Sequence, residues 1–378
     1  MTQDSRTVLN DSEGMTLALE WAARGMVITA PNPRVGCVIV KDGVVIGAGH
    51  TQPAGQAHAE IQALRDAAER GNDVRGATAY VTLEPCSHYG RTPPCSNALI
   101  EAGLGRVVAA MGDPNPLVAG RGMAQLEAAG IAVSSGLLAD AAHELNIGFL
   151  SRMRRGLPWV RLKVAASLDG ATALENGESQ WITGPAARAD GHAWRARTQV
   201  ILTGIGTVKA DNPQLTVRGI DTPLPPRRVI VDSRLDIDLD ARILQGEPCW
   251  IVAAGAHQEK AAALRAAGHE VWYLPNAHGK VDLSALMREL GRREINEVHV
   301  EAGAKLNASL VREGCVDELL VYLAPSLIGP GQGMFDLPQL AQLAERRRLR
   351  FHDVARVGDD LRVLARFTET ETETKPEE

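Results

Sequence analysis

Cysteine is scarce in this chain and thinly spread. The 378 residues include five cysteines, an odd number. We therefore expect no disulfide framework and expect a reducing, cytoplasmic location. In that environment, grouped cysteines are more often metal ligands or catalytic residues. No apolar run approaches about 18 residues, so no membrane span is expected. The first residues, MTQDSRTVLNDSEG, are polar, so we expect no secretory signal.

An excess of positive charge is also missing. Lysine and arginine total 40 against 46 aspartates and glutamates, a net charge of −6. This balance argues against a protein that binds a nucleic-acid backbone. Hydrophobic residues make up 45% of the chain, which is ample for packed cores. The length favours two domains, because domains usually have about 100–200 residues.

The hydrophobic pattern predicts two successive α/β blocks. In the first block, apolar runs at Val35–Val40, Ala77–Leu83 and Gly105–Met111 predict buried strands between helices. The second block alternates strands and helices, and its end, Leu349–Phe367, predicts two antiparallel strands. We therefore expect a sheet covered by helices, followed by a mixed sheet with an antiparallel C-terminal edge.

A Gly-Leu-Pro break at residues 156–158 marks the boundary between the blocks. The pattern predicts one helix over Ala139–Arg155, which this break ends. We expect a first domain over residues 1–152 and a second over residues 153–367. Residues 368–378 read TETETETKPEE, which predicts a disordered acidic tail.

One motif of the first block carries metal chemistry. His58 and Glu60 stand at the start of a predicted helix, and Cys86 and Cys95 follow. Two thiolates and one imidazole give zinc three ligands and leave the fourth tetrahedral position for water. Zinc brings the pKa of that water towards neutrality, and the Glu60 carboxylate can pass its proton to a leaving amino group. This is the pattern of zinc-dependent base deaminases.

Other interpretations of the motif remain open from the residues alone. His88 as a fourth ligand would close the site into a structural zinc, but Glu60 would then have no role. A non-catalytic zinc module is a second alternative. A nucleoside or tRNA-type deaminase with an unrelated binding domain is a third. Eight residues separate Cys86 from Cys95, whereas the usual deaminase signature has two, which counts against the third.

The longer loop and its neighbours resemble a known family. The strings are NPRVG at 32–36, HAE at 58–60, TLEPCSHYGRTPPC at 82–95 and DPNPLVAGRG at 113–122. Together they resemble the bifunctional riboflavin-biosynthesis deaminase/reductase. The resemblance implies a cytidine-deaminase-like three-layer domain, with His58, Cys86 and Cys95 on zinc and Glu60 as proton shuttle. It also implies that three residues face the pyrimidine and its phosphoribosyl group: Asn32, His88 and Arg91.

The residues of the second block are less specific. No G-x-G-x-x-G follows its first strand, so a Rossmann site is not supported. Short glycine loops follow predicted strands at Thr203–Thr207 and Glu301–Lys305, and the second leads into a helix whose N-terminus suits a pyrophosphate. Ser233 and Arg234 suit the 2′-phosphate of NADP or simply form a polar loop.

The resemblance extends over this block through AASLDG at 165–170, GESQWIT at 177–183, VDS at 231–233 and the segment 206–218. It implies a dihydrofolate-reductase-like domain that uses NADPH. The implied cofactor contacts are Ala165, Trp181, Thr207, Asp211, Ser233, Gly303, Ala304, Lys305, Leu306, Asn307, Ala308 and Ser309. The implied substrate contacts are Ser179, Arg195, Leu215, Arg218 and Glu301. The residues alone leave other roles open for three of these positions. Asp211 could cap a helix, Trp181 could be a packing residue, and Glu301 could be a salt-bridge partner.

The resemblance therefore implies a two-step enzyme of riboflavin biosynthesis. The first domain would deaminate 2,5-diamino-6-hydroxy-4-(5-phosphoribosylamino)pyrimidine hydrolytically at zinc. The second would then reduce the ribosyl side chain with NADPH to give 5-amino-6-(5-phosphoribitylamino)uracil. We expect this small-molecule substrate, no nucleic-acid or membrane partner and, by resemblance only, a homodimer.

Overall fold

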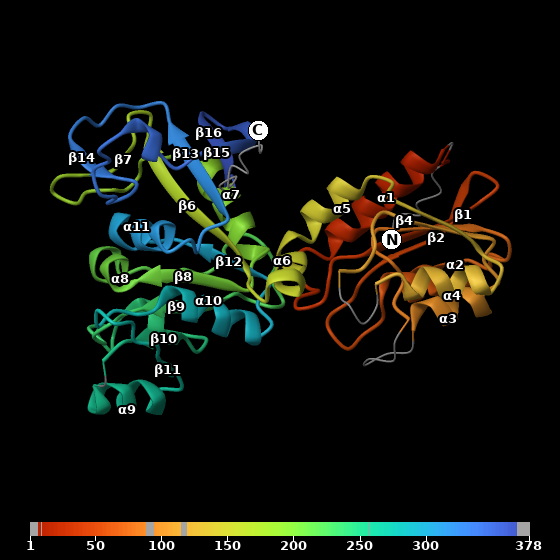
Figure 1. Ribbon diagram of the computed structural model, residues 1–378, viewed down its shortest axis with the longest axis horizontal. Helices are drawn as coiled ribbons and strands as arrows, with labels where there is room; N and C mark the ends of the chain where they lie inside the picture. The colour runs from red at the N-terminus through yellow and green to blue at the C-terminus, as the bar shows by residue number, and fades with distance from the viewer. Residues whose placement is uncertain (1–6, 9, 88–93, 115–118, 256, 369–378) are drawn as a thin grey trace, which may run out of the picture. The chain divides into compact units, whose positions relative to one another are not determined.

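The computed structural model describes residues 7–8, 10–87, 94–114, 119–255 and 257–368. The chain forms two compact units, each described here by itself (Figure 1). The first runs to Pro158 and includes residues 222–224 and 294–296, and the second contains the rest. The boundary expected at residue 152 falls inside a helix, α6 (Ile147–Arg155). The expected tail lies, apart from Thr368, outside the described residues.

A five-stranded sheet forms the middle layer of the first unit. Its order is β2-β1-β3-β4-β5, in which β1 pairs antiparallel with β2 and β3, and β3, β4 and β5 run parallel. The strands are β1 (Gly36–Lys41), β2 (Val44–His50), β3 (Thr78–Val81), β4 (Arg106–Ala109) and β5 (Ala132–Ser135). The apolar runs predicted β1, β3 and β4, with ends that differ by a few residues.

Helices cover both faces of this sheet, because side chains alternate along each strand. Cys37 and Ile39 of β1 pack with α2, α3 and α4, whereas Val38 and Val40 pack with α1 and α5 (Figure 1). The helices are α1 (Asp11–Arg24), α2 (Ala59–Glu69), α3 (Cys95–Glu101), α4 (Arg121–Ala128) and α5 (Ala139–Leu145). The expected three-layer arrangement is confirmed.

The prediction of one helix over residues 139–155 is wrong. The helix is interrupted at Asn146, which separates α5 from α6. The buried Asn146 side chain accepts the Arg34 N–H at 2.7 Å and donates to the Arg34 carbonyl at 2.9 Å. A tertiary contact therefore fixes the break, and helical periodicity does not reveal it.

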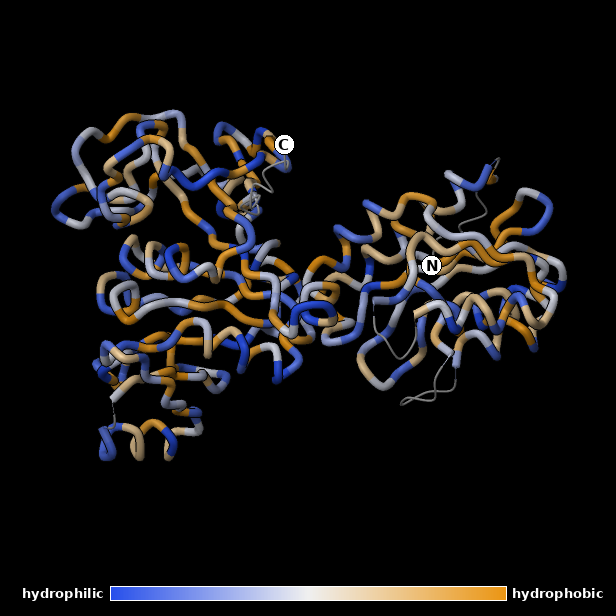
Figure 2. Tube along the Cα trace, viewed as in Figure 1, coloured by the Kyte–Doolittle hydropathy of each residue, from blue (hydrophilic) through white to orange (hydrophobic). Residues whose placement is uncertain are grey.

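A nine-stranded mixed sheet organises the second unit, in the order β11-β10-β9-β8-β12-β6-β13-β16-β15. The strands from β11 to β13 are parallel, and β16 and β15 form an antiparallel edge, as expected. They are β6 (Trp159–Ser167), β8 (Val200–Gly204), β9 (Arg227–Val231), β10 (Trp250–Ala253), β11 (Glu270–Tyr273), β12 (Glu297–Val300), β13 (Glu318–Ala324), β15 (Leu349–Val357) and β16 (Asp360–Phe367). Figure 2 colours several of these strands as hydrophobic.

Five helices accompany this sheet in the described residues: α7 (Pro185–Ala196), α8 (Ile205–Asp211), α9 (Gln258–Ala266), α10 (Leu283–Arg292) and α11 (Ala304–Arg312). Two 3₁₀ turns lie at Arg242–Leu244 and Leu343–Glu345. A separate two-stranded sheet of β7 (Ala171–Leu174) and β14 (Gly331–Gly333) was not predicted. No helix of the described segments is long and apolar enough to cross a membrane.

Candidate active sites

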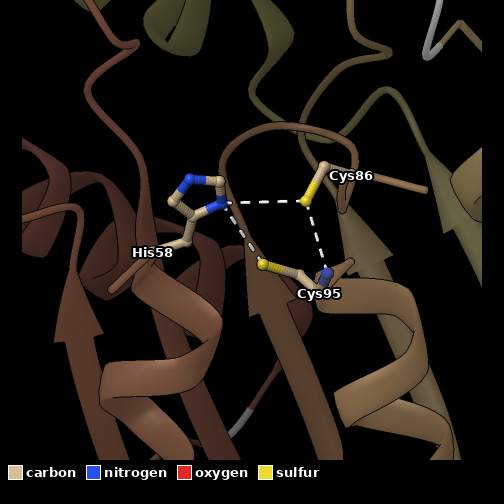
Figure 3. A group of neighbouring side chains, drawn as sticks. All are labelled: His58, Cys86 and Cys95. Carbon is tan, nitrogen blue, oxygen red and sulfur yellow. Dashed lines mark hydrogen bonds between the residues drawn. The ribbon is translucent and has the colours of Figure 1, made fainter. Parts of the chain in front are cut away.

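Three side chains converge at the helix starts on one face of the first sheet. His58 is the N-cap of α2, Cys95 is the first residue of α3, and Cys86 lies in the loop after β3. The Nδ1 atom of His58 lies 3.7 Å from the Cys86 sulfur and 3.4 Å from the Cys95 sulfur (Figure 3). The sequence-predicted metal ligands are thus brought together.

These atoms fit a zinc ion. Tetrahedral ligands at about 2.3 Å (sulfur) and 2.0 Å (nitrogen) from zinc stand about 3.5 Å apart. The two nitrogen–sulfur distances above bracket that value, and the three ligand atoms lie within 4.8 Å of one another. Within the described segments, no further histidine, cysteine or acid completes this group. His88, the alternative fourth ligand, lies outside the described residues.

The surroundings of Cys86 favour a thiolate, the form that binds zinc. The pKa of Cys86 is lowered to about 4, first by a hydrogen bond from the Cys95 thiol and then by His58. The backbone N–H of Cys95 also donates to the Cys86 sulfur at 3.3 Å. The hydrogen bond between the two cysteines raises the pKa of Cys95. The hydrogen bond to Cys86 raises the pKa of His58.

Glu60 is a buried carboxyl on the first turn of α2, only 4% exposed. Burial and the neighbouring Cys86 charge raise its pKa to about 7, although His58 acts in the opposite direction. A group with a pKa near the operating pH both accepts and releases protons readily, as a general acid–base catalyst must.

Of the three expected deaminase substrate contacts, Asn32 alone is described. It is half-buried in the segment before β1, and its backbone N–H donates to the Thr29 carbonyl at 2.9 Å. His88 and Arg91 lie outside the described residues.

In the second unit, Glu301 follows β12 and lies among cationic side chains. Arg195 of α7 donates to both of its carboxylate oxygens, at 2.9 Å from Nη2 to Oε2. Burial alone would raise the pKa of Glu301, but the charge of Arg195 and its hydrogen bonds hold it well below the usual range. Arg195 and Glu301 form an ion pair, which confirms the salt-bridge interpretation of Glu301. Their contacts with substrate stay predictions.

The sequence analysis missed three members of this cluster: Lys163, His192 and His299, whose Nε2 lies 3.4 Å from Glu301 Oε1. Lys163 of β6 places its Nζ 3.9 Å from Glu301 Oε2. His192 of α7 accepts the Arg218 backbone N–H at 3.2 Å, and its other ring nitrogen lies 3.3 Å from Arg218 Nε. A usable signal existed, because Lys163 precedes the predicted contact Ala165 by two residues and therefore shares its face of the strand.

The remaining substrate residues are placed around α7. Leu215 is buried in the segment after α8, and Arg195 Nη1 donates to the next carbonyl, Thr216, at 2.9 Å. Ser179 is half-exposed on the segment before α7. These contacts tie the 212–218 segment to α7.

The expected cofactor residues gather mainly where parallel strands end. Thr207 and Asp211 lie on α8 after β8, Ser233 follows β9, and residues 303–309 open α11 after β12. The starts of α8 and α11 are in contact, since a Cβ on Gly204 would lie 2.9 Å from Leu306 Cδ2. Ligands of α/β sheets bind at such carboxyl ends of strands.

Trp181 stands apart from the strand ends, on the segment before α7. Its indole is 67% exposed, and the Arg188 guanidinium lies 4.6 Å from its ring centre. The packing interpretation of Trp181 is therefore not supported. Its expected cofactor contact stays a prediction.

The chain resembles known proteins along almost its whole length. The family described as the cytidine and deoxycytidylate deaminase zinc-binding region matches residues 9–111, and the RibD C-terminal domain matches residues 158–363. A riboflavin biosynthesis protein RibD of Escherichia coli is 47% identical over 368 residues, which is 93% of this chain and 98% of the relative. The chain belongs to the RibD family.

Solved structures of RibD proteins agree with this membership. One from Acinetobacter baumannii has a TM-score of 0.86 and 45% identity, covering 95% of this chain and 99% of the other. One from Thermotoga maritima, titled a diaminohydroxyphosphoribosylaminopyrimidine deaminase/5-amino-6-(5-phosphoribosylamino)uracil reductase, has a TM-score of 0.86 and 32% identity, covering 94% and 98%.

As a RibD family member, this chain is a bifunctional deaminase and reductase of riboflavin biosynthesis. The expected fold class is confirmed in both units, with a zinc-binding deaminase fold first and a reductase domain second. The alternatives of a tRNA-type deaminase with an unrelated partner domain and of a non-catalytic zinc module are thereby wrong.

Proposed function

We propose that His58, Cys86 and Cys95 hold the zinc of the deaminase and that Glu60 moves its protons. Zinc bound there supplies a Lewis acid that makes water nucleophilic near neutral pH. Glu60 takes the proton of the attacking water on its carboxylate and delivers it to the leaving amino nitrogen, which departs as ammonia. The observation that carries this proposal is the convergence of the three ligand atoms beside one buried carboxyl.

The substrate of this step is 2,5-diamino-6-hydroxy-4-(5-phosphoribosylamino)pyrimidine. Asn32 lies on the segment that leads into β1, and we assign it, with His88 and Arg91, to the pyrimidine and its phosphoribosyl group. A guanidinium such as that of Arg91 suits a phosphate, because it donates two parallel hydrogen bonds.

The reductase step follows in the domain of residues 153–367. NADPH supplies a hydride there, which converts the ribosyl side chain to the ribityl side chain of 5-amino-6-(5-phosphoribitylamino)uracil. Gly303 caps α11 without a side chain, so the first backbone N–H groups of that helix suit the cofactor pyrophosphate. We assign Ala165, Trp181, Thr207, Asp211 and Ser233 to the remainder of the cofactor.

The cationic cluster suits the phosphorylated substrate. The charges of Arg195 and Arg218 both act on His192. Arg218 lies beside that imidazole, and Arg195 is held by Glu301. Guanidinium binds phosphate bidentately, so this cluster orients the ribosyl phosphate. Ser179 and Leu215 complete the substrate contacts that we propose.

Substitution of Glu60 tests the assignment. In Glu60→Gln, ammonia release from the diaminopyrimidine should fall by about 100-fold or more, since general acid–base catalysis contributes about that factor. The same variant should still oxidise NADPH when given the deaminated intermediate. Retained ammonia release in Glu60→Gln would overturn the role of Glu60, and loss of both activities would point to unfolding instead.

We also propose a homodimer through the edge strand β15. Phe351 is 74% exposed, Val354 is 55% exposed and Leu349 is 38% exposed on this strand, which ends the nine-stranded sheet. Exposed apolar edge strands are templates for pairing with another chain. Sedimentation should give a dimer for the wild type and a monomer for Phe351→Glu; a monomeric wild type contradicts the proposal.

The cytoplasm is the compartment that we propose for the enzyme. None of the five cysteines forms a disulfide bond, as expected in a reducing environment.

A further inference from the structure

A buried carboxylate stands two residues before the first zinc thiolate, and the deaminase chemistry does not use it. Glu84 is 4% exposed. Its Oε1 accepts the N–H groups of Gly122 at 2.9 Å and Met123 at 3.4 Å. Its Oε2 accepts those of Gly120 at 2.9 Å and Asp113 at 3.2 Å. With four backbone donors on two oxygens, this side chain holds main chain in place.

The main chain that Glu84 holds is the start of α4. The N-cap of α4 is Gly120, in the left-handed region at φ 76°, and it offers no capping side chain. The first N–H groups of a helix need partners from outside it, and a negative charge is favourable there. Glu84, which lies far from α4 in the sequence, supplies both the hydrogen-bond acceptors and the negative charge. The helix is thereby fixed to the segment that leads to Cys86.

Backbone contact reinforces this attachment. A Cβ on Gly122 would lie 1.9 Å from the Pro85 carbonyl oxygen and 3.3 Å from Glu84 Oε1. No side chain therefore separates α4 from the peptide that precedes Cys86, and a shift of the helix would shift that peptide.

The next turn of α4 contacts the two residues that follow Cys95. Gln125 Oε1 accepts the Ser96 hydroxyl at 2.8 Å, and Gln125 Nε2 donates to Asn97 Oδ1. Ser96 follows Cys95 directly, and its backbone N–H and hydroxyl lie 3.1 and 3.0 Å from the Cys86 carbonyl. One short helix thus contacts the chain just before Cys86 and just after Cys95.

We propose that Glu84 and Gln125 are positioning residues that set the separation of the two zinc thiolates through α4. The inference rests on the proposed zinc-dependent deaminase. Residues behind metal ligands orient those ligands, and their loss weakens metal binding. Glu84 and Gln125 touch neither thiolate, so their effect reaches the metal through the backbone on either side.

The test measures metal binding by the full-length chain, with Zn²⁺ alone against a chromophoric chelator and with Co²⁺ alone by its visible spectrum. In Glu84→Gln, zinc affinity should fall by about 10- to 100-fold and the cobalt bands should shift. Deaminase kcat should fall with them, while reductase activity on the deaminated intermediate stays at the wild-type level. Asp66→Asn is the matched control, because that carboxylate accepts the Ala48 N–H at 2.8 Å elsewhere in the same unit.

Gln125→Ala keeps the proposal testable if Glu84→Gln does not fold, since Gln125 is only half-buried. It should lower zinc affinity in the same direction, whereas Glu127→Ala, on the exposed face of the same helix, should not. Wild-type zinc affinity and an unchanged cobalt spectrum in Gln125→Ala and in folded Glu84→Gln would overturn the inference. A wild-type chain that binds no zinc would overturn the deaminase assignment itself, and this inference with it.

Discussion

At the scale of single residues, each site contains a glutamate, and the pKa values of the two glutamates are shifted in opposite directions. Burial and the Cys86 charge raise the pKa of Glu60 to about 7, although His58 acts in the opposite direction. Glu301 is somewhat more exposed, at 13% of its side chain, and is paired with Arg195, so its pKa is held well below the usual range. The first carboxyl is thereby suited to proton transfer and the second to a permanent negative charge.

The Arg195–Glu301 pair predicts a stability difference with a definite pH dependence. Glu301→Gln leaves Arg195 without its charged partner and should lower the free energy of unfolding by about 3 kcal/mol at neutral pH. A lowered folded-state pKa stabilises the protein above the unfolded value of about 4.3 and loses that effect as the pH falls through the folded value. Urea unfolding of both proteins between pH 7 and acid checks this; a pH-independent difference would contradict it.

Substitution of Arg218 should separate binding from hydride transfer. In Arg218→Ala the KM for the reductase substrate should rise by about 10-fold or more, because a charge-assisted contact to phosphate contributes about 1.5–3 kcal/mol. Ammonia release should not change. Steady-state kinetics with the deaminated intermediate measures it, and an unchanged KM would remove Arg218 from the substrate site.

The zinc ligands and Glu60 were predicted from sequence because their residue types and order carry the chemistry directly. The cationic cluster was predicted only in part. Arg195, Arg218 and Glu301 came from the family resemblance, and the position of Lys163 two residues before Ala165 offered a signal that was not used. His192 became visible only when the structure placed it beside Arg218. Spacing along the chain does not report such contacts between elements.

At the scale of elements, most strands and helices were predicted, and the errors have physical causes. The apolar runs at β1 and β8 are buried on both faces and stand out in sequence. The break at Asn146 and the short β7–β14 pair depend on partners far along the chain, at Arg34 and across about 160 residues. The local hydrophobic pattern does not predict such long-range contacts.

Close approach between elements gives a test of packing in the first unit. A Cβ on Gly36 of β1 would lie 1.9 Å from the Ala18 carbonyl of α1, so Gly36→Ala forces the helix away from the sheet. It should lower the free energy of unfolding by about 1–3 kcal/mol. Gly191 of α7 has open space around its Cβ position, so Gly191→Ala should raise it by about 0.5–1 kcal/mol. Denaturant unfolding measures both, and equal effects would contradict the packing argument.

At the scale of the whole molecule, one chain contains two chemistries with separate requirements. The thiolate–imidazole group belongs to the first unit, and the cationic cluster and the strand-end loops belong to the second. Among the described residues, those that we assign to each site belong to a single unit. Each activity should therefore respond to its own perturbation.

Metal removal tests that separation. Dialysis against a zinc chelator should abolish ammonia release and leave NADPH oxidation with the deaminated intermediate intact. Added Zn²⁺ should restore the first activity in wild type and in Cys249→Ser, whose buried thiol lies in the second unit, but not in Cys86→Ser. Parallel loss of both activities on chelation would show that zinc supports the whole chain.

The most direct measurement follows ammonia and NADPH together after mixing the wild-type enzyme with the diaminopyrimidine substrate. We predict that ammonia appears first and that each NADPH oxidised is preceded by one ammonia released. Without NADPH, ammonia release should proceed and stop at one equivalent of substrate. Oxidation of NADPH before any ammonia is released would contradict the account of two sites acting in that order.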